Sequence, residues 1–303
     1  MDKIKIGIPR GLLYYKYNAL YLTFFKELGL DVVVSPITNK EILDKGKKYA
    51  MDEACLSLKI YMGHVWYLIN KVDYIFVPRI VSLKKGMKLC TYFSALYDIV
   101  RNTFDTKVLG LNIDVDKNIT EEDAFVKLGE ELGFSKNYTL DAYKKAKREE
   151  YKQSKIKYLI QQKKLKTDKT KVLLVSHPYN LTDNLVGEVI KEILKKLDVE
   201  IILSDVYNVC INSELYKNIS PRLYFTYNQE LLNAIEEYKS KVDGIILLST
   251  FPCGPDSLVN EMCTRKLNDK IITIMMDELS SKEGIETRIE SFIDILKKED
   301  IYE

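Results

Sequence analysis

The sequence predicts an α/β protein made of two lobes, each with a mostly parallel sheet. Three observations lead to this prediction. Short apolar runs of strand length alternate with helical patterns through the first third of the chain, a charged stretch without strands follows, and the alternation then resumes. Helices between strands are the crossover connections that parallel sheets require. A length of 303 residues also suits two domains better than one.

The first lobe is predicted to span residues 1–118. Gly29 directly follows its first helical pattern, and a glycine in this position commonly ends a helix. The alternation places helices on both faces of the sheet. In chain order we expect a strand at Ile4–Ile8, a helix at Leu12–Leu28, a strand at Asp31–Val34, a helix at Cys55–Asn70, a strand at Tyr74–Val77, a helix at Thr91–Phe104 and a strand at Lys107–Leu111.

Residues 119–168 are predicted to form a helical connector. From about Thr120 to Lys166 the sequence is charged and helical in pattern, with no candidate strand. The stretch from Tyr143 to Lys171 is crowded with lysines. A charge run of this kind is more often a solvated helix than a docking surface, so we expect a solvated connecting helix.

The second lobe is predicted at residues 169–303, where the alternation resumes. Each lobe opens with a strand that runs into a turn containing proline, Pro9 in the first and Pro178 in the second. This likeness favours a cleft between two lobes whose strand ends face each other, a common place for a site. The expected elements are strands at Lys171–Ser176, Val199–Leu203, Gly244–Leu248 and Lys270–Met275, and helices at Leu181–Leu197, Asn228–Lys239, Asp256–Leu267 and Gly284–Lys298.

Composition argues against several classes of protein. The net charge of +2 gives no support for nucleic-acid binding. No apolar run reaches the ~18 residues of a membrane helix, and the N-terminus runs straight into a strand without the features of a signal peptide. Five cysteines without short-range pairing fit a reducing cytoplasm. Neither the P-loop nor the dinucleotide fingerprint occurs, so binding of ATP or NAD by these loops is not expected.

Three cysteines lie where α/β proteins build their sites. Cys253 follows the strand Gly244–Leu248 in a turn rich in proline and glycine, and Cys55 and Cys90 each stand at the probable start of a helix. Open α/β sheets bind ligands at the carboxyl ends of their strands, and a helix N-terminus favours the thiolate that ligates metal. Three such thiols indicate an iron–sulfur cluster with one iron left without a cysteine. For any one of them, a buried structural cysteine is the alternative.

The spacing of these cysteines is less informative than their placement. Neither Cys-x-x-Cys nor a ferredoxin run is present, so a cluster would be assembled from distant segments, and spacing does not separate iron–sulfur from zinc. For Cys210 and Cys263 we expect packing in the core, and for His64 we expect packing of its helix. The side chains expected to tune the cluster by charge and hydrogen bonding are Arg10, Arg79 and His177, all near predicted strand ends.

Several motifs are similar to those of one known family. They are Ile6–Leu13 (IGIPRGLL), Glu53–Cys55 with Lys59 and Gly63–Val65, Phe76–Ser82 (FVPRIVS), Cys90, His177–Asn180 (HPYN), Phe251–Ser257 (FPCGPDS), and Asp277–Glu278 with Gly284–Phe292. Together these motifs resemble the acyl-CoA dehydratase activase-related family, whose relatives include 2-hydroxyacyl-CoA dehydratases, benzoyl-CoA reductases and double-cubane cluster proteins. The resemblance runs from Ile6 to Phe292.

This resemblance implies two flavodoxin-like (Rossmann-like) lobes around one cluster bound by three cysteines, which by motif are Cys55, Cys90 and Cys253. With five cysteines in the chain, a single [4Fe-4S] cluster is expected rather than a double cubane. The resemblance also implies an ATP-hydrolysing activase as electron donor, acting in trans because no activase module is present here. Ser57 and Tyr97 stand where the family often has proline, and neither change removes a ligand.

The expected function is that of a cytoplasmic iron–sulfur protein that accepts electrons for a low-potential reduction or passes them on. A small-molecule substrate is expected at the open iron, and the sequence leaves open whether the protein is an enzyme or a relay. Dehydratase subunits are longer than this chain, so acyl-CoA binding does not carry over from the resemblance. The alternatives are a metal-free two-lobed protein that binds a small ligand, and the same architecture with a zinc site.

Overall fold

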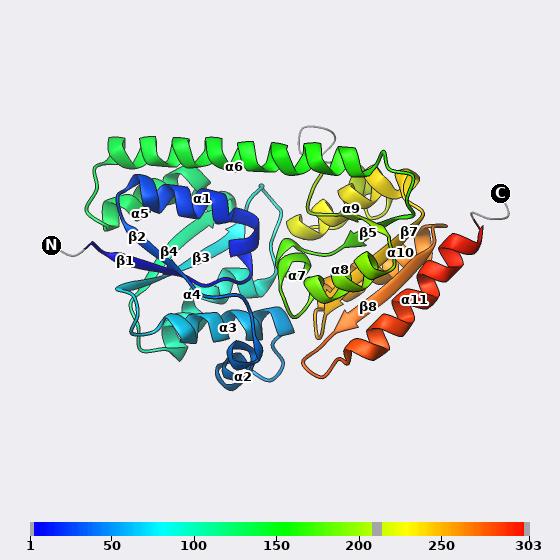
Figure 1. The fold of residues 1–303 in the computed structure, drawn as a ribbon. Coiled ribbons are helices and arrows are strands. Elements are labelled where there is room, and N and C mark those ends of the chain that lie inside the picture. Colours follow the sequence, from blue (N-terminus) through cyan, green and yellow to red (C-terminus); the bar gives the residue numbers. More distant parts are fainter. Residues whose placement is uncertain (1–2, 208–213, 300–303) are drawn as a thin grey trace. The chain divides into compact units, whose positions relative to one another are not determined.

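The computed structural model describes residues 3–207 and 214–299, and it divides into two compact units. The first comprises Met1–Ser154 with Tyr224–Thr226, and the second comprises Lys155–Leu223 with Tyr227–Glu303. Within the described ranges each unit has one four-stranded parallel sheet with helices on both faces (Figure 1). The predicted fold class, two flavodoxin-like α/β lobes, is confirmed. No helix in these ranges has both the length and the apolar character to cross a membrane.

The sheet of the first unit has the strand order β2-β1-β3-β4. Phe76 of β3 packs against Tyr21 of α1, which also contacts Phe125 of α5, so α1 and α5 cover one face. Leu68 at the end of α3 lies over Gly7 and Tyr97 of α4 over Gly110, so α3 and α4 cover the other. The strands are β1 (Lys5–Ile8), β2 (Asp31–Val34), β3 (Tyr74–Ser82) and β4 (Val108–Asp114), and the helices are α1 (Leu13–Glu27), α2 (Lys40–Tyr49), α3 (Leu56–Leu68), α4 (Thr91–Thr103), α5 (Glu121–Glu131) and α6 (Lys136–Lys164), which continues into the second unit.

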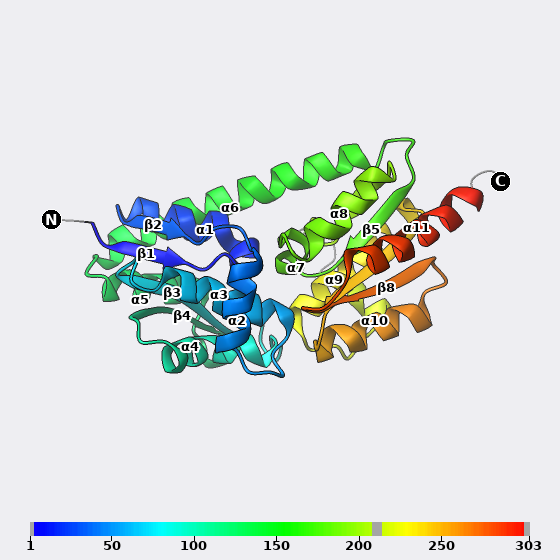
Figure 2. The ribbon, with the colours of Figure 1, turned by 60° about the horizontal axis from the view of Figure 1, so that its bottom comes forward.

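The second unit repeats this arrangement with the strand order β6-β5-β7-β8. Helices α11 and α10 lie on opposite sides of β8 (Figure 2). Every residue of β7 is buried, as expected for the continuous apolar run of a central parallel strand. Helix α11 packs over Gly244 and alongside α8, while α10 follows β7 on the other face. The strands are β5 (Lys171–Val175), β6 (Glu200–Leu203), β7 (Gly244–Thr250) and β8 (Ile271–Met276), and the helices are α7 (Pro178–Thr182), α8 (Gly187–Lys196), α9 (Thr226–Tyr238), α10 (Gly254–Lys266) and α11 (Lys282–Glu299).

The structure differs from the sequence-based prediction in a few elements. Helix α2 was not expected, because its ten residues are mostly polar and contain Gly46. The single helix expected at Leu181–Leu197 is two helices, α7 and α8, since Pro178 starts a short helix early and the chain leaves helical geometry at Asp183. Strand β3 extends past Pro78 to Ser82. The helix stop at Gly29 is confirmed by its positive φ of 75°.

Helices α2 and α3 pack backbone against backbone. A Cβ built at Gly46 would lie 1.8 Å from the carbonyl oxygen of Lys59, and one at Gly63 would lie 1.9 Å from that of Ile42. Neither position has room for a methyl group, so the two glycines permit this close approach. The helix that follows Cys55 is therefore fixed in place by α2, which the sequence did not reveal.

Candidate functional site

Cys55, Cys90 and Cys253 occupy the same position in their elements. Each is the N-cap residue of a helix, of α3, α4 and α10 respectively, and none of the three side chains accepts the capping hydrogen bond. None forms a disulfide, and all three are partly exposed. The first N–H groups of a helix and its dipole favour negative charge, so each placement favours the thiolate.

Both units bring predicted site residues to the carboxyl edge of their sheet. In each sheet the first and third strands of the unit are neighbours, and their following helices lie on opposite faces, which makes this edge the crevice where open α/β sheets hold ligands. Arg10 follows β1, and the loop to Cys90 follows β3. His177 follows β5, and Cys253 follows β7. Each unit thus presents one cysteine and one polar side chain at equivalent strand ends.

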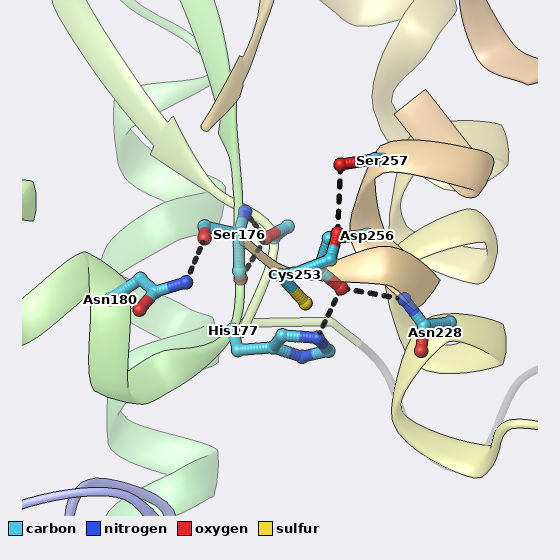
Figure 3. Close-up of polar contacts among 8 residues, drawn as sticks. Ser176, His177, Asn180, Asn228, Cys253, Asp256 and Ser257 are labelled. Atoms are coloured by element: carbon cyan, nitrogen blue, oxygen red, sulfur yellow. Dashed lines mark hydrogen bonds and ion pairs between the residues drawn. The ribbon is translucent and has the colours of Figure 1, made fainter. Parts of the chain in front are cut away.

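In the second unit, Cys253 belongs to a buried polar network (Figure 3). The Cys253 side chain hydrogen-bonds to the Asp256 carboxylate one helical turn later. Asn228 Nδ2 donates to Asp256 Oδ1 at 2.8 Å, and His177 Nε2 lies 2.9 Å from the same oxygen. The hydroxyl of Ser257 donates to the backbone oxygen of Cys253 at 2.7 Å and fixes the start of α10.

The charge of Asp256 is maintained in spite of its burial. Burial alone would raise the pKa of this carboxyl, but the neighbouring His177 and the hydrogen bonds from His177, Asn228 and Cys253 outweigh it and lower the pKa below its ordinary value. The ring of His177 also stacks on that of Tyr179. The His177 side chain is therefore fixed on two sides, with one nitrogen directed at the carboxylate beside Cys253.

In the first unit, Cys55 and Cys90 share a neighbour. Tyr92, the second residue of α4, is half-buried, and burial is the main cause that raises its pKa. The negative charges of Cys55, Cys90 and Glu53 raise this pKa further. Both thiols therefore lie within electrostatic range of one phenol, although 35 residues separate them in the sequence, as their numbers 55 and 90 show. No motif or spacing in the sequence pointed to Tyr92.

Arg10 is positioned by a chain of buried polar side chains. Its backbone N–H donates to Ser35 Oγ at 2.8 Å, and its Nε donates to the Ser35 carbonyl at 2.9 Å. Ser35 Oγ lies 3.0 Å from His64 Nδ1, and Thr38 Oγ1 lies 3.0 Å from His64 Nε2. Because Ser35 Oγ accepts from Arg10, its own proton is available to Nδ1, which matches a neutral His64 whose Nε2–H donates to Thr38. His64 thus has a structural role: it is buried in α3, which fits the predicted helix packing, and it also supports Arg10 through Ser35.

This arrangement predicts a pH dependence of folding stability. Burial, and then the charge of Arg10, lower the pKa of His64 from 6.5 to about 3. At pH values between 3 and 6.5 the His64 ring takes up a proton in the unfolded chain but stays neutral in the folded protein. The contribution of His64 to folding stability is therefore complete above pH 6.5 and is lost as the pH falls toward 3. From pH 6.5 to 5 the free energy of unfolding is expected to fall by up to about 1.4 kcal/mol per pH unit from this group.

Denaturant unfolding at several pH values measures this slope. Replacement of His64 by Gln removes the titrating ring, so the variant should show a slope shallower by one proton over the same range. Equal slopes for wild type and His64→Gln would show that the ring does not stay neutral in the folded state.

Arg79 is placed differently from Arg10. It lies in β3, and its Nη1 is 3.6 Å from Asp98 Oδ2 on α4. Its Nε is buried and has no hydrogen-bond partner, while the side chain as a whole is 41% exposed. The ion pair ties α4, the helix capped by Cys90, to the sheet. That Arg79 tunes a cluster stays a prediction.

The other cysteines are accounted for separately. Cys263 is fully buried in α10, and burial raises the pKa of its thiol to about 12, which fits the predicted packing role. Cys210 lies outside the described residues. Among residues 3–207 and 214–299, no three His, Cys, Asp or Glu side chains are grouped as the ligands of one metal ion would be.

Two residues of the Cys253 network were not selected from the sequence. Asp256 had a usable signal, since it stands three residues after Cys253 at the start of a helix and so lies on the same side of that helix. Asn228 had none. It is 28 residues from Asp256 in the sequence and meets it only because the fold places the start of α9 beside that of α10.

Comparisons with solved structures give remote similarities. They include glucosamine-6-phosphate deaminase from Thermotoga maritima (10% identity, 92% of this chain and 77% of that one, TM-score 0.23). Another is a periplasmic solute binding protein from Actinobacillus succinogenes with bound D-allose (14% identity, 98% of this chain and 92% of that one, TM-score 0.23). A third is a LacI family transcriptional regulator from Arthrobacter sp. (11% identity, 98% of this chain and 91% of that one, TM-score 0.24). At such TM-scores these similarities carry no argument about this chain.

The sequence itself gives a firmer result. No curated protein matches it. Residues 5–206 match the family described as CoA enzyme activase uncharacterised domain (DUF2229). These residues include the whole N-terminal sheet, Cys55, Cys90, and the strand and turn that carry His177. Since the match covers more than half of the sequence, the chain belongs to this CoA enzyme activase-related family.

Proposed function

We propose that this protein holds a [4Fe-4S] cluster through Cys55, Cys90 and Cys253. The observation that carries the proposal is the shared placement of these three thiols, each at the N-cap of a helix and none in a disulfide. Thiolates are the ligands that iron–sulfur clusters require, and a helix N-terminus stabilises them. Membership in a CoA enzyme activase-related family supports a role beside such enzymes.

The donor set fits the group. Three partly exposed cysteines, two in the first unit and one in the second, supply three thiolates and leave one iron without a protein ligand. That iron would supply a Lewis acid or an electron-accepting centre for a small substrate. The proposal rests on the placement of each thiol in its own unit, since the described residues contain no group of ligands already drawn together.

The surrounding side chains have definite tasks in this proposal. In the cluster-free protein Asp256 accepts a hydrogen bond from the Cys253 thiol and is itself held by Asn228 and His177, so it orients this thiol until the sulfur loses its proton and ligates iron. Tyr92 is half-buried and lies within electrostatic range of both Cys55 and Cys90. Arg10, fixed by Ser35, adds positive charge at the edge of the first sheet.

We further propose that the electrons come from a separate ATP-hydrolysing activase, and that the protein serves a low-potential reduction or relay related to that of 2-hydroxyacyl-CoA dehydratases. The family match supports the activase relationship, and the motif resemblance supports the relation to the dehydratases. A partner in trans is part of this proposal. A CoA-thioester titration, with and without iron, separates substrate binding from electron relay.

The experiment that tests the proposed cluster is anaerobic reconstitution. Protein purified without oxygen is incubated with iron and sulfide, desalted, and assayed for bound iron, acid-labile sulfide and zinc, together with a visible spectrum. About four irons and four sulfides per chain, with a broad absorbance near 400 nm, are expected. Stoichiometric zinc in a colourless protein, or protein that stays iron-free, would contradict the proposal and favour the zinc-containing or metal-free ligand-binding alternatives.

A further inference from the structure

Three residues of the second half of the chain pair with the loop that carries Cys90. Tyr224–Thr226 packs with the first unit, although the sequence on both sides of it belongs to the second. Phe225 forms a parallel bridge with Lys88, in which Lys88 N–H donates to the Tyr224 carbonyl and Thr226 N–H donates to the Lys88 carbonyl, both at 2.9 Å. Lys88 stands two residues before Cys90. We call Tyr224–Thr226 the strap.

The Cys90 loop is also held from its own unit. The Asp116 carboxylate accepts hydrogen bonds from Gly86 N–H and from Lys88 Nζ. Leu89 N–H donates to the Val81 carbonyl, which closes the loop just before Cys90. Lys88 is thus held through its side chain by Asp116 and through its backbone by the strap. The strap supplies both backbone hydrogen bonds of the bridge, so it sets the position of Lys88, which stands two residues before Cys90.

The strap ends where helix α9 begins, since Thr226 is the first residue of that helix. The N–H of a first helical residue has no partner inside the helix, so the N–H of Thr226 is available to the Lys88 carbonyl.

We propose that the strap positions Cys90 through the two backbone hydrogen bonds that it forms with Lys88. Lys88, Phe225 and Thr226 are positioning residues in this proposal, because they act through the neighbouring cysteine loop. The proposal rests on the proposed function only in taking Cys90 as a ligand of the cluster. The strap contacts themselves belong to the cluster-free protein and are tested there.

Position 226 offers a substitution that removes one contact and little else. Proline at the first position of a helix is well tolerated, since the N–H there has no partner inside the helix and φ already suits the ring. Thr226→Pro therefore deletes the hydrogen bond to the Lys88 carbonyl while α9 keeps its start. Thr226→Val is the matched control: it keeps the N–H and the branched shape, and it loses only a buried hydroxyl that has no hydrogen-bond partner.

The readout is the rate at which limiting iodoacetamide alkylates each cysteine in the cluster-free protein. Mass spectrometry of the peptides measures this rate. Loss of one backbone hydrogen bond should speed alkylation of Cys90 about fivefold through local opening. Cys55, which begins another helix, serves as the internal reference and should not change. Thr226→Val should match the wild type at all three positions.

Each other result counts against the proposal. Unchanged rates in a folded Thr226→Pro variant would overturn it, and so would a rise at Cys55 as large as that at Cys90. If Thr226→Pro does not fold, hydrogen exchange of the Lys88 and Thr226 amides in the wild type decides: both should be protected, and free exchange of either would overturn the proposal. Reconstitution of the wild type is scored separately, so failure of the cluster proposal is distinguishable from failure of the strap.

Discussion

Replacement of any one of Cys55, Cys90 or Cys253 by Ser is expected to remove most of the iron that the reconstituted protein holds. A serine hydroxyl at a helix N-cap is a much weaker ligand than a thiolate, and with three protein ligands the loss of one leaves two irons without a side chain. The measurement is iron and sulfide per chain after anaerobic reconstitution and desalting, with the visible spectrum as a second readout. The three single variants should behave alike, because each thiol occupies the same N-cap position.

Cys263→Ala is the matched control for this series. Cys263 also belongs to α10, but it is fully buried, and burial raises the pKa of its thiol to about 12. The control is expected to keep its iron and sulfide at some cost in stability from the smaller side chain. Circular dichroism confirms that each variant is folded before iron is counted. Iron retained in all three Ser variants, or lost equally in Cys263→Ala, would contradict the ligand assignment.

Gly63→Ala is expected to lower the free energy of unfolding by about 2 kcal/mol or more. The added methyl would lie 1.9 Å from the Ile42 carbonyl oxygen and 2.8 Å from its carbon, both of which are backbone atoms. These cannot rotate away, so α2 and α3 must separate, which is the overpacking that destabilises cores by about 1–3 kcal/mol and at times more. The strain outweighs the gain of about 1 kcal/mol that alanine usually brings to a helix interior.

Denaturant unfolding of Gly63→Ala beside Gly254→Ala measures this effect. Gly254 is also helical, as the first residue of α10, and an added methyl there meets nothing within 4 Å. The control should be neutral or slightly stabilising. If both variants unfold at the wild-type denaturant concentration, α2 and α3 do not pack as closely as described. Because α3 begins at Cys55, Gly63→Ala should also reduce the iron retained after reconstitution.

The sequence was informative where local pattern decides the structure. Strand β7 reads as a continuous apolar run because both faces of a central parallel strand are buried, and the stop at Gly29 follows from its freedom to adopt positive φ. The N-cap positions of the cysteines were predictable for a similar reason, since a thiol after a strand or a turn and before a helical pattern must stand near a helix start. Helix α2 was not, because its stability comes from contact with α3 rather than from its own pattern.

The site was less predictable because its contacts join distant segments. His64 looked like a packing residue on an apolar helix, yet it supports Arg10 through Ser35, which is 29 residues away. Asn228 reaches Asp256 only through the placement of α9 beside α10. Sequence pattern specifies which face of an element is apolar, but it does not specify which polar side chains two packed elements bring together.

In the proposed site, three cysteines hold one four-iron cluster and leave one iron without a cysteine. Mössbauer spectroscopy of wild-type protein reconstituted with ⁵⁷Fe and measured under argon tests this arrangement, because the technique separates irons by their ligands. One iron distinct from the other three is expected, with a signal that shifts when a small oxygen or nitrogen ligand is added. Four equivalent irons unaffected by such a ligand, or no cluster signal at all, would contradict it.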